Sequence, residues 1–132
     1  MKSKFKAKLK SIGIYQDYNK KSKQVPKLIK YTTQVPTRLG IEFGYIVHIE
    51  KAKGKVIDFT IEHPPFHNSQ GKVAPPFKGS VHIKNNDYLW YLGDTVWEPI
   101  HDKTGIWRLI TKIDGQVIAD ESLTLHKDNL ED

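Results

Sequence analysis

Cysteine is absent from the 132-residue sequence, and arginine is rare, with only Arg38 and Arg108. Without cysteine, the chain can form neither a disulfide, nor a thiol nucleophile, nor a thiolate metal site. No apolar run approaches the roughly 20 residues that a membrane-spanning helix needs. The lysine-rich start also lacks the apolar stretch of a secretory signal peptide. We therefore expect a soluble, cytoplasmic protein without a membrane span.

The motifs of the common enzyme classes are missing as well. The sequence contains no Gly-x-Ser-x-Gly elbow, no phosphate-binding loop and no glycine-rich dinucleotide turn. Asp94 and Glu98 are close enough to form a carboxylate pair, but such a pair in a turn is ordinarily solvated. His63 and His67 have a spacing that suits a metal on a helix, whereas here two prolines separate them, which favours ordinary surface histidines. We expect no enzymatic activity, no metal and no cofactor.

Lysine is abundant in the N-terminal part of the chain. Residues 1–30 carry ten lysines and one acid, a balance of +9, whereas the whole chain carries +6, so the remainder is acidic. A two-residue period places five of these lysines on one face of a strand; they are Lys2, Lys4, Lys6, Lys8 and Lys10. This basic patch is either a binding face for nucleic acid or another anionic surface, or a solvated face that protects an edge strand. The scarcity of arginine favours the solvated face.

Alternation of apolar and polar residues with period two recurs in short segments between turn residues, and no long stretch has a helical period. The clearest strand covers residues 40–50, with inward side chains Ile41, Phe43, Tyr45, Val47 and Ile49. We expect it to pair antiparallel with residues 55–63 through a hairpin loop at 51–54. In the first strand, residues 5–18, the inward set shifts between Leu9 and Ile12, which predicts a bulge near Lys10 and Ser11.

The C-terminal part has an equally clear hairpin signal. Asp114-Gly115 separates two alternating runs, residues 106–113 and 116–125, and predicts a type I′ turn, because that turn needs positive φ at both central residues. Further strands are predicted at 27–35, 80–84, 88–92 and 95–98. Two Pro-Pro pairs predict a long irregular connection from Pro64 to Gly79, which is the first place to look for binding.

These segments predict an all-β fold. About seven to eight strands with hairpins and one long connection favour an immunoglobulin-like, antiparallel, Greek-key β-sandwich. We expect a single domain over residues 1–125, a polar tail over residues 126–132, and three aromatic side chains between the sheets, Phe43, Phe59 and Trp107.

The order of several motifs resembles a small family of uncharacterised bacterial domains. The resemblance covers roughly residues 30–125 and rests on Pro36-x-x-x-Gly40-x-x-Phe43-Gly44, Gly54, His63-Pro64-Pro65, Glu98-Pro99, Gly105-x-Trp107, Asp114-Gly115 and Leu123. It implies an immunoglobulin-like sandwich. It implies no catalytic or binding residues.

Aromatic residues gather in the C-terminal half. Since neighbouring residues of a strand face opposite sides, Trp90 and Tyr91 cannot both face the core, and we expect one of them to be exposed. Our hypothesis is a binding face that combines Trp90 or Tyr91 with Phe66 and Phe77 of the long connection. The alternative is that these aromatic side chains simply pack in the core and across strands.

The sequence as a whole predicts a non-enzymatic binding module that recognises a protein partner through a sheet edge or the long connection. The alternatives are binding of nucleic acid or an anionic surface through the lysine-rich segment, and binding of carbohydrate through exposed aromatics. Homodimerisation by edge-strand pairing also fits, because a sandwich leaves open edges.

Overall fold

The computed structural model describes residues 5–16, 25–67 and 70–127, and within these ranges it contains nine strands and no helix. The strands are β1 (Lys6–Tyr15), β2 (Leu28–Tyr31), β3 (Gln34–Pro36), β4 (Glu42–Glu50), β5 (Val56–Glu62), β6 (Phe77–His82), β7 (Asp87–Thr95), β8 (Gly105–Ile113) and β9 (Gln116–His126). The predicted all-β sandwich is confirmed, with nine strands where seven to eight were predicted. No helix in the part of the chain described could cross a membrane.

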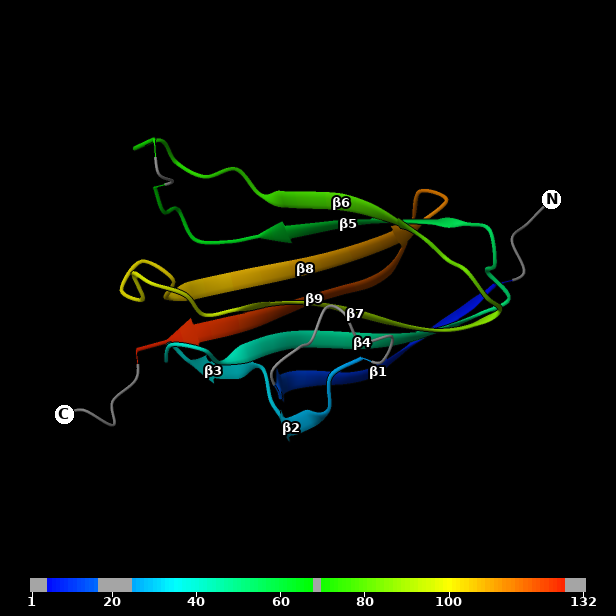
Figure 1. Cartoon of the computed structure of the whole chain (residues 1–132), viewed down its shortest axis with the longest axis horizontal. Coiled ribbons are helices and arrows are strands. Elements are labelled where there is room, and N and C mark those ends of the chain that lie inside the picture. The colour runs from blue at the N-terminus through cyan, green and yellow to red at the C-terminus, as the bar shows by residue number, and fades with distance from the viewer. Residues whose placement is uncertain (1–4, 17–24, 68–69, 128–132) are drawn as a thin grey trace.

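The strands form two layers (Figure 1). One sheet has four strands in the order β2-β1-β4-β7, and the other has five in the order β3-β9-β8-β5-β6. All neighbouring strands are antiparallel except β3 and β9, which are parallel. Because the two inner faces carry the apolar half of each alternating pattern, the core lies between the sheets. Phe43 and Trp107 are fully buried there and meet edge to face at 5.3 Å, while Phe59 is half-buried.

The predicted hairpin between β4 and β5 is wrong. β4 pairs with β1 and β7, whereas β5 pairs with β6 and β8 in the other sheet. The connection from β4 to β5 crosses from one sheet to the other, with Ala52 buried and two backbone hydrogen bonds to the β6–β7 connection. Lys51 N donates to Asn86 O and Gly54 N to Ile83 O, both at 2.9 Å. The two connections therefore close the same end of the sandwich side by side.

Two local predictions are confirmed. The register of β1 against β4 shifts between Leu9 and Ser11, which leaves Lys10 as the extra residue of a bulge. Asp114 and Gly115 have φ angles of 53° and 76°, so the β8–β9 hairpin turns with positive φ at both central residues.

Several boundaries differ from those predicted. The segment predicted as one strand at 27–35 forms β2 in one sheet and β3 in the other. β6 begins at Phe77, so the irregular connection is shorter than predicted, and β7 runs through Gly93 and Asp94, where a break was predicted. The predicted polar tail begins at His126, which is the last residue of β9; residues 128–132 lie outside the described ranges.

Candidate functional site

Trp90 and Tyr91, two of the predicted binding residues, lie on opposite faces of β7, yet each is only 8% exposed. Trp90 faces the core, where its indole N–H donates to Thr111 Oγ1 at 3.0 Å and its ring lies 5.6 Å from that of Phe59. Tyr91 faces outward and is covered by Tyr15, whose ring is 5.2 Å away at 73°. The expectation that one of the two is exposed is therefore wrong, because the outer face of the four-stranded sheet has a small apolar cluster of its own.

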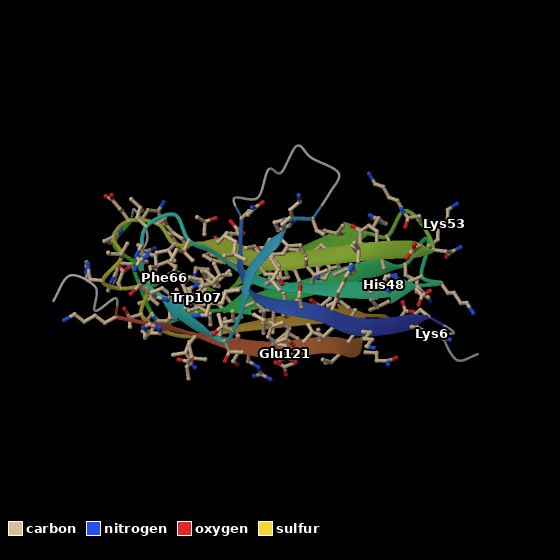
Figure 2. All side chains as sticks on the ribbon, turned by 90° about the horizontal axis from the view of Figure 1, so that it is seen from below. Lys6, His48, Lys53, Phe66, Trp107 and Glu121 are labelled. Carbon is tan, nitrogen blue, oxygen red and sulfur yellow. The ribbon has the colours of Figure 1, made fainter. Side chains whose placement is uncertain are left out.

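Phe66 and Phe77 are the other two predicted binding residues, and Phe66 lies at the far end of the sandwich from Lys6, His48 and Lys53 (Figure 2). Their ring centroids are 6.3 Å apart, and Phe66 is buried among His63, Trp97 and Trp107. The connection between β5 and β6 is therefore folded back onto the core.

Lys103 belongs to the same aromatic cluster, and no sequence pattern pointed to it. Its side chain is buried, with Nζ 4.6 Å from the Phe66 ring centroid and 4.5 Å from that of Trp97. Nζ also donates to Pro99 O at 3.0 Å and forms an ion pair with Asp102 at 2.6 Å. The two aromatic faces, the carbonyl and the carboxylate compensate the charge of the buried ammonium, and these contacts link the β7–β8 connection to the aromatic cluster.

Of the predicted basic patch, Lys6, Lys8 and Lys10 are exposed on the outer face of the four-stranded sheet; Lys2 and Lys4 lie outside the described residues. Two adjoining cavities of about 530 and 600 Å³ lie on this face, and both are lined by Lys10 and Leu89. The face is not purely basic.

Acidic groups sit among these lysines. Glu50 is the cross-strand partner of Lys6. On the same face, His48 Nε2 lies 2.5 Å from Asp87 Oδ1.

The free edges of the two sheets differ in their protection. β2 has four residues, β3 has three and ends in Pro36, and β6 has six and carries Lys78. β7 has nine residues, contains neither lysine nor proline, and pairs with β4 at all nine positions without a bulge. Short length, charged side chains (lysine above all), proline and bulges keep an edge strand from pairing with another chain. Among the described strands at sheet edges, β7 is the longest; it lacks lysine, proline and a bulge, and its charged residues are Asp87 and Asp94.

A slot with a volume of about 460 Å³ runs beside β7. The five-stranded sheet carries β5 and β6 beyond the edge of the four-stranded sheet (Figure 1), so part of its inner face has no strand opposite. Phe59 and Val81 are consequently only half-buried, and they line the slot with Ile61, Trp90 and Leu92. The slot is thus an apolar extension of the core that opens at the edge of β7.

The polar side of the slot is acidic. Glu42 is buried and accepts hydrogen bonds from the hydroxyl groups of Tyr91 and Thr95. Burial, and then the neighbouring Glu42 carboxylate, raise the pKa of Tyr91 well above its usual range, so the phenol stays protonated as a donor. Asp94 also lines the slot, and none of the described residues in its lining is basic.

Sequence reasoning named two residues of the lining, Trp90 and Tyr91, but it predicted neither the slot nor the edge position of β7. It placed a break at Gly93-Asp94, which hides the length of β7, and strand order is not encoded in any local pattern. The available signal was the unbroken run of strand-forming residues from Tyr88 to Leu92 without lysine or proline.

The architecture is shared with a solved structure. The chain is similar to an immunoglobulin-like protein from Pseudomonas aeruginosa, with a TM-score of 0.72 and 18% sequence identity over 92% of this chain and 97% of that chain. At this identity the similarity shows an immunoglobulin-like fold. No curated protein matches the chain. Residues 3–125 match the family described as Domain of unknown function (DUF3859), and the chain belongs to that family.

Proposed function

We propose that the protein is a non-catalytic recognition module that binds an extended segment of a partner protein as an additional strand on β7. The observation that carries this proposal is the coincidence of a long edge strand, free of lysine, proline and bulges, with an open apolar slot. In binding by strand addition, backbone hydrogen bonds to the edge supply affinity and pockets for alternate side chains supply specificity.

The lining of the slot indicates which side chains the partner segment should carry. A strand added to β7 would lie opposite the overhanging β5 and β6, and every second side chain would point toward Phe59, Ile61 and Val81. Apolar side chains at these alternate positions would complete the core and cover the half-exposed Phe59 and Val81. The partner segment is therefore expected to be an alternating one, without acidic residues facing Glu42.

A second copy of this chain fits the edge less well. Antiparallel pairing of β7 with β7 of another copy keeps the same face of both sheets on the same side. Each copy would then bring its own β5 and β6 overhang to the same space beside the junction. A single extended segment has no such overhang, so we favour a partner segment over homodimerisation.

The two alternatives from the sequence have less support. For nucleic acid or an anionic surface, the exposed Lys6, Lys8 and Lys10 share their face with Glu50 and Asp87, which weakens the positive potential there. For carbohydrate, the stacking platform would be an exposed indole, whereas Trp90 and Trp107 are buried. The half-buried Trp97 packs against Phe66 and Phe77.

The test is a selection from a library of random peptides, followed by amide hydrogen exchange of the protein with a selected peptide. We expect enrichment of peptides with apolar residues at alternate positions, and slower exchange of backbone amides in β7. A Val81→Glu variant should lose the peptide, because a carboxylate would enter the slot beside Glu42. The matched control is Val117→Glu, which makes the same change at an exposed site on β9 and should bind normally.

Thermal unfolding of both variants shows whether they are folded. Protection that appears at β1 and β4 around Lys8 and Lys10, with binding abolished by high salt, would overturn the proposal in favour of an anionic ligand. Equal loss of binding in Val81→Glu and Val117→Glu would also count against the slot.

A further inference from the structure

A separate cavity of about 640 Å³ lies at the end of the sandwich that holds the C-terminal end of β9. Three segments far apart in sequence form it: the β3–β4 connection, the β7–β8 connection and Lys127. Its lining consists of Thr37, Arg38, Leu39, Ile100, His101, Thr104 and Lys127. Cavities of roughly 300–1,000 Å³ are the size that small ligands occupy.

Hydrogen bonds from neighbouring segments fix the walls of this cavity. Thr37 is buried, and both its N–H and its hydroxyl donate to His126 O, at 2.9 and 2.8 Å. In the facing wall, Lys103 N donates to Ile100 O at 3.1 Å, and Trp107 Nε1 donates to Lys103 O at 2.8 Å. The buried Lys103 side chain anchors this wall to the aromatic cluster. The cavity is therefore a built feature of the fold.

The lining has a distinct chemical character. Leu39 is 56% exposed and Ile100 is 40% exposed, which leaves two aliphatic side chains open to solvent on either side of the cavity. Arg38 and Lys127 add two basic side chains and His101 adds an imidazole, and none of the described residues that line the cavity is acidic. Exposed aliphatic groups beside cations complement a ligand that has both an apolar part and a negative charge.

We infer that this cavity binds a small aliphatic carboxylate, with the chain of the acid between Leu39 and Ile100 and its carboxylate near Arg38 and Lys127. Guanidinium and ammonium groups are the usual partners of a carboxylate, and Leu39 and Ile100 supply apolar contacts for its hydrocarbon chain. This site is separate from β7, so the inference stands or falls independently of strand addition.

The experiment is a titration of the protein with sodium octanoate, followed by amide NMR spectra. We expect saturable shifts confined to residues 37–41, 100–104 and 127. Octyltrimethylammonium, which has the same chain and the opposite charge, should produce no saturable shift there, and acetate should bind far more weakly because it lacks the chain.

Variants test separately the contacts to the carboxylate and to the hydrocarbon chain of octanoate. Arg38→Gln or Lys127→Gln should each weaken octanoate binding by about two- to fivefold, the effect of one partly exposed ion pair. Leu39→Ser should weaken it by roughly tenfold through loss of apolar contact. The matched controls, Lys78→Gln on β6 and Val117→Ser on β9, should bind as the unchanged protein does.

Three results would overturn the inference. They are the absence of saturable shifts up to the solubility of octanoate, equal binding of the cationic probe, and equal weakening by the control variants. Binding to vesicles of anionic phospholipid without binding of free octanoate would reassign this end of the sandwich to a membrane surface.

Discussion

Glu42 and Tyr91 show how single residues shape the edge of the sandwich. Glu42 is a buried carboxylate whose two oxygens accept from the hydroxyls of Tyr91 and Thr95, so its charge is compensated by hydrogen bonds. A buried carboxylate that loses one hydrogen-bond donor is no longer fully compensated for the loss of its hydration, which destabilises the folded state. The pair therefore stabilises the end of β7 beside the slot.

Changing Tyr91 to phenylalanine tests this pair. The ring and its contact with Tyr15 remain, but Glu42 loses one donor, so the free energy of unfolding should fall by about 1–3 kcal/mol. Urea denaturation followed by tryptophan fluorescence measures the change. Tyr31→Phe is the control, since Tyr31 is 66% exposed, and its effect should stay within about 0.5 kcal/mol. Equal effects of the two variants would show that the Glu42 contact contributes nothing.

At the scale of elements, β7 depends on close approach to β4. Gly93 is the cross-strand partner of Gly44, and a Cβ at Gly93 would lie 2.2 Å from Phe43 O and 2.3 Å from the Tyr91 hydroxyl. A backbone oxygen cannot move away without breaking the ladder between the strands. A side chain at this position is therefore incompatible with the observed pairing.

We expect Gly93→Ala to destabilise the protein by about 1–3 kcal/mol, the usual cost of forcing extra volume into a packed site. Amide hydrogen exchange should show that the loss of protection begins at β7 and β4. The comparison variant is Ser80→Ala on β6, which removes a solvent-exposed hydroxyl and its bond to Asp58 without adding volume. Unchanged protection of β7 in Gly93→Ala would mean that the two strands are not packed as closely as described.

Considered as a whole, the molecule buries tyrosine hydroxyls on both sides of the four-stranded sheet. Burial raises the pKa of Tyr15 to about 12, with a smaller opposite effect from its hydrogen bond to Ser11. Burial likewise raises the pKa of Tyr45 and Tyr91 well above the usual range. In the unfolded chain the pKa of a tyrosine is about 10. The unfolded state therefore loses protons at a lower pH than the folded state.

The stabilisation from these tyrosines should be complete below about pH 10 and should be lost as the pH rises through the folded-state values. We expect cooperative unfolding at alkaline pH. The buried tyrosines should ionise only when the protein unfolds, so part of the rise in tyrosinate absorbance should coincide with the change in tryptophan fluorescence. If every tyrosine ionises while the fluorescence still reports a folded protein, the three phenols are more accessible than their burial indicates.

Local features of the fold were predictable because they depend on residues close together in sequence. The β8–β9 turn follows from Asp114-Gly115, the bulge in β1 from the shifted pattern between Leu9 and Ile12, and the inward face of β4 from its alternation. The same alternation correctly placed Trp90 and Tyr91 on opposite faces. It did not predict their burial, since the outer cover of Tyr91 comes from Tyr15 on another strand.

The sequence by itself determined the all-β class, the strand-forming segments and the faces of the strands, since each follows from side-chain period and turn chemistry over a few residues. Only the tertiary structure decided that β4 and β5 belong to different sheets and that β7 is an edge. It also decided that Thr37 bonds to His126, 89 positions away, beside a cavity of about 640 Å³. These features depend on which apolar faces pack together. Many strand orders satisfy the same local pattern, and the order observed is decided by contacts between distant segments.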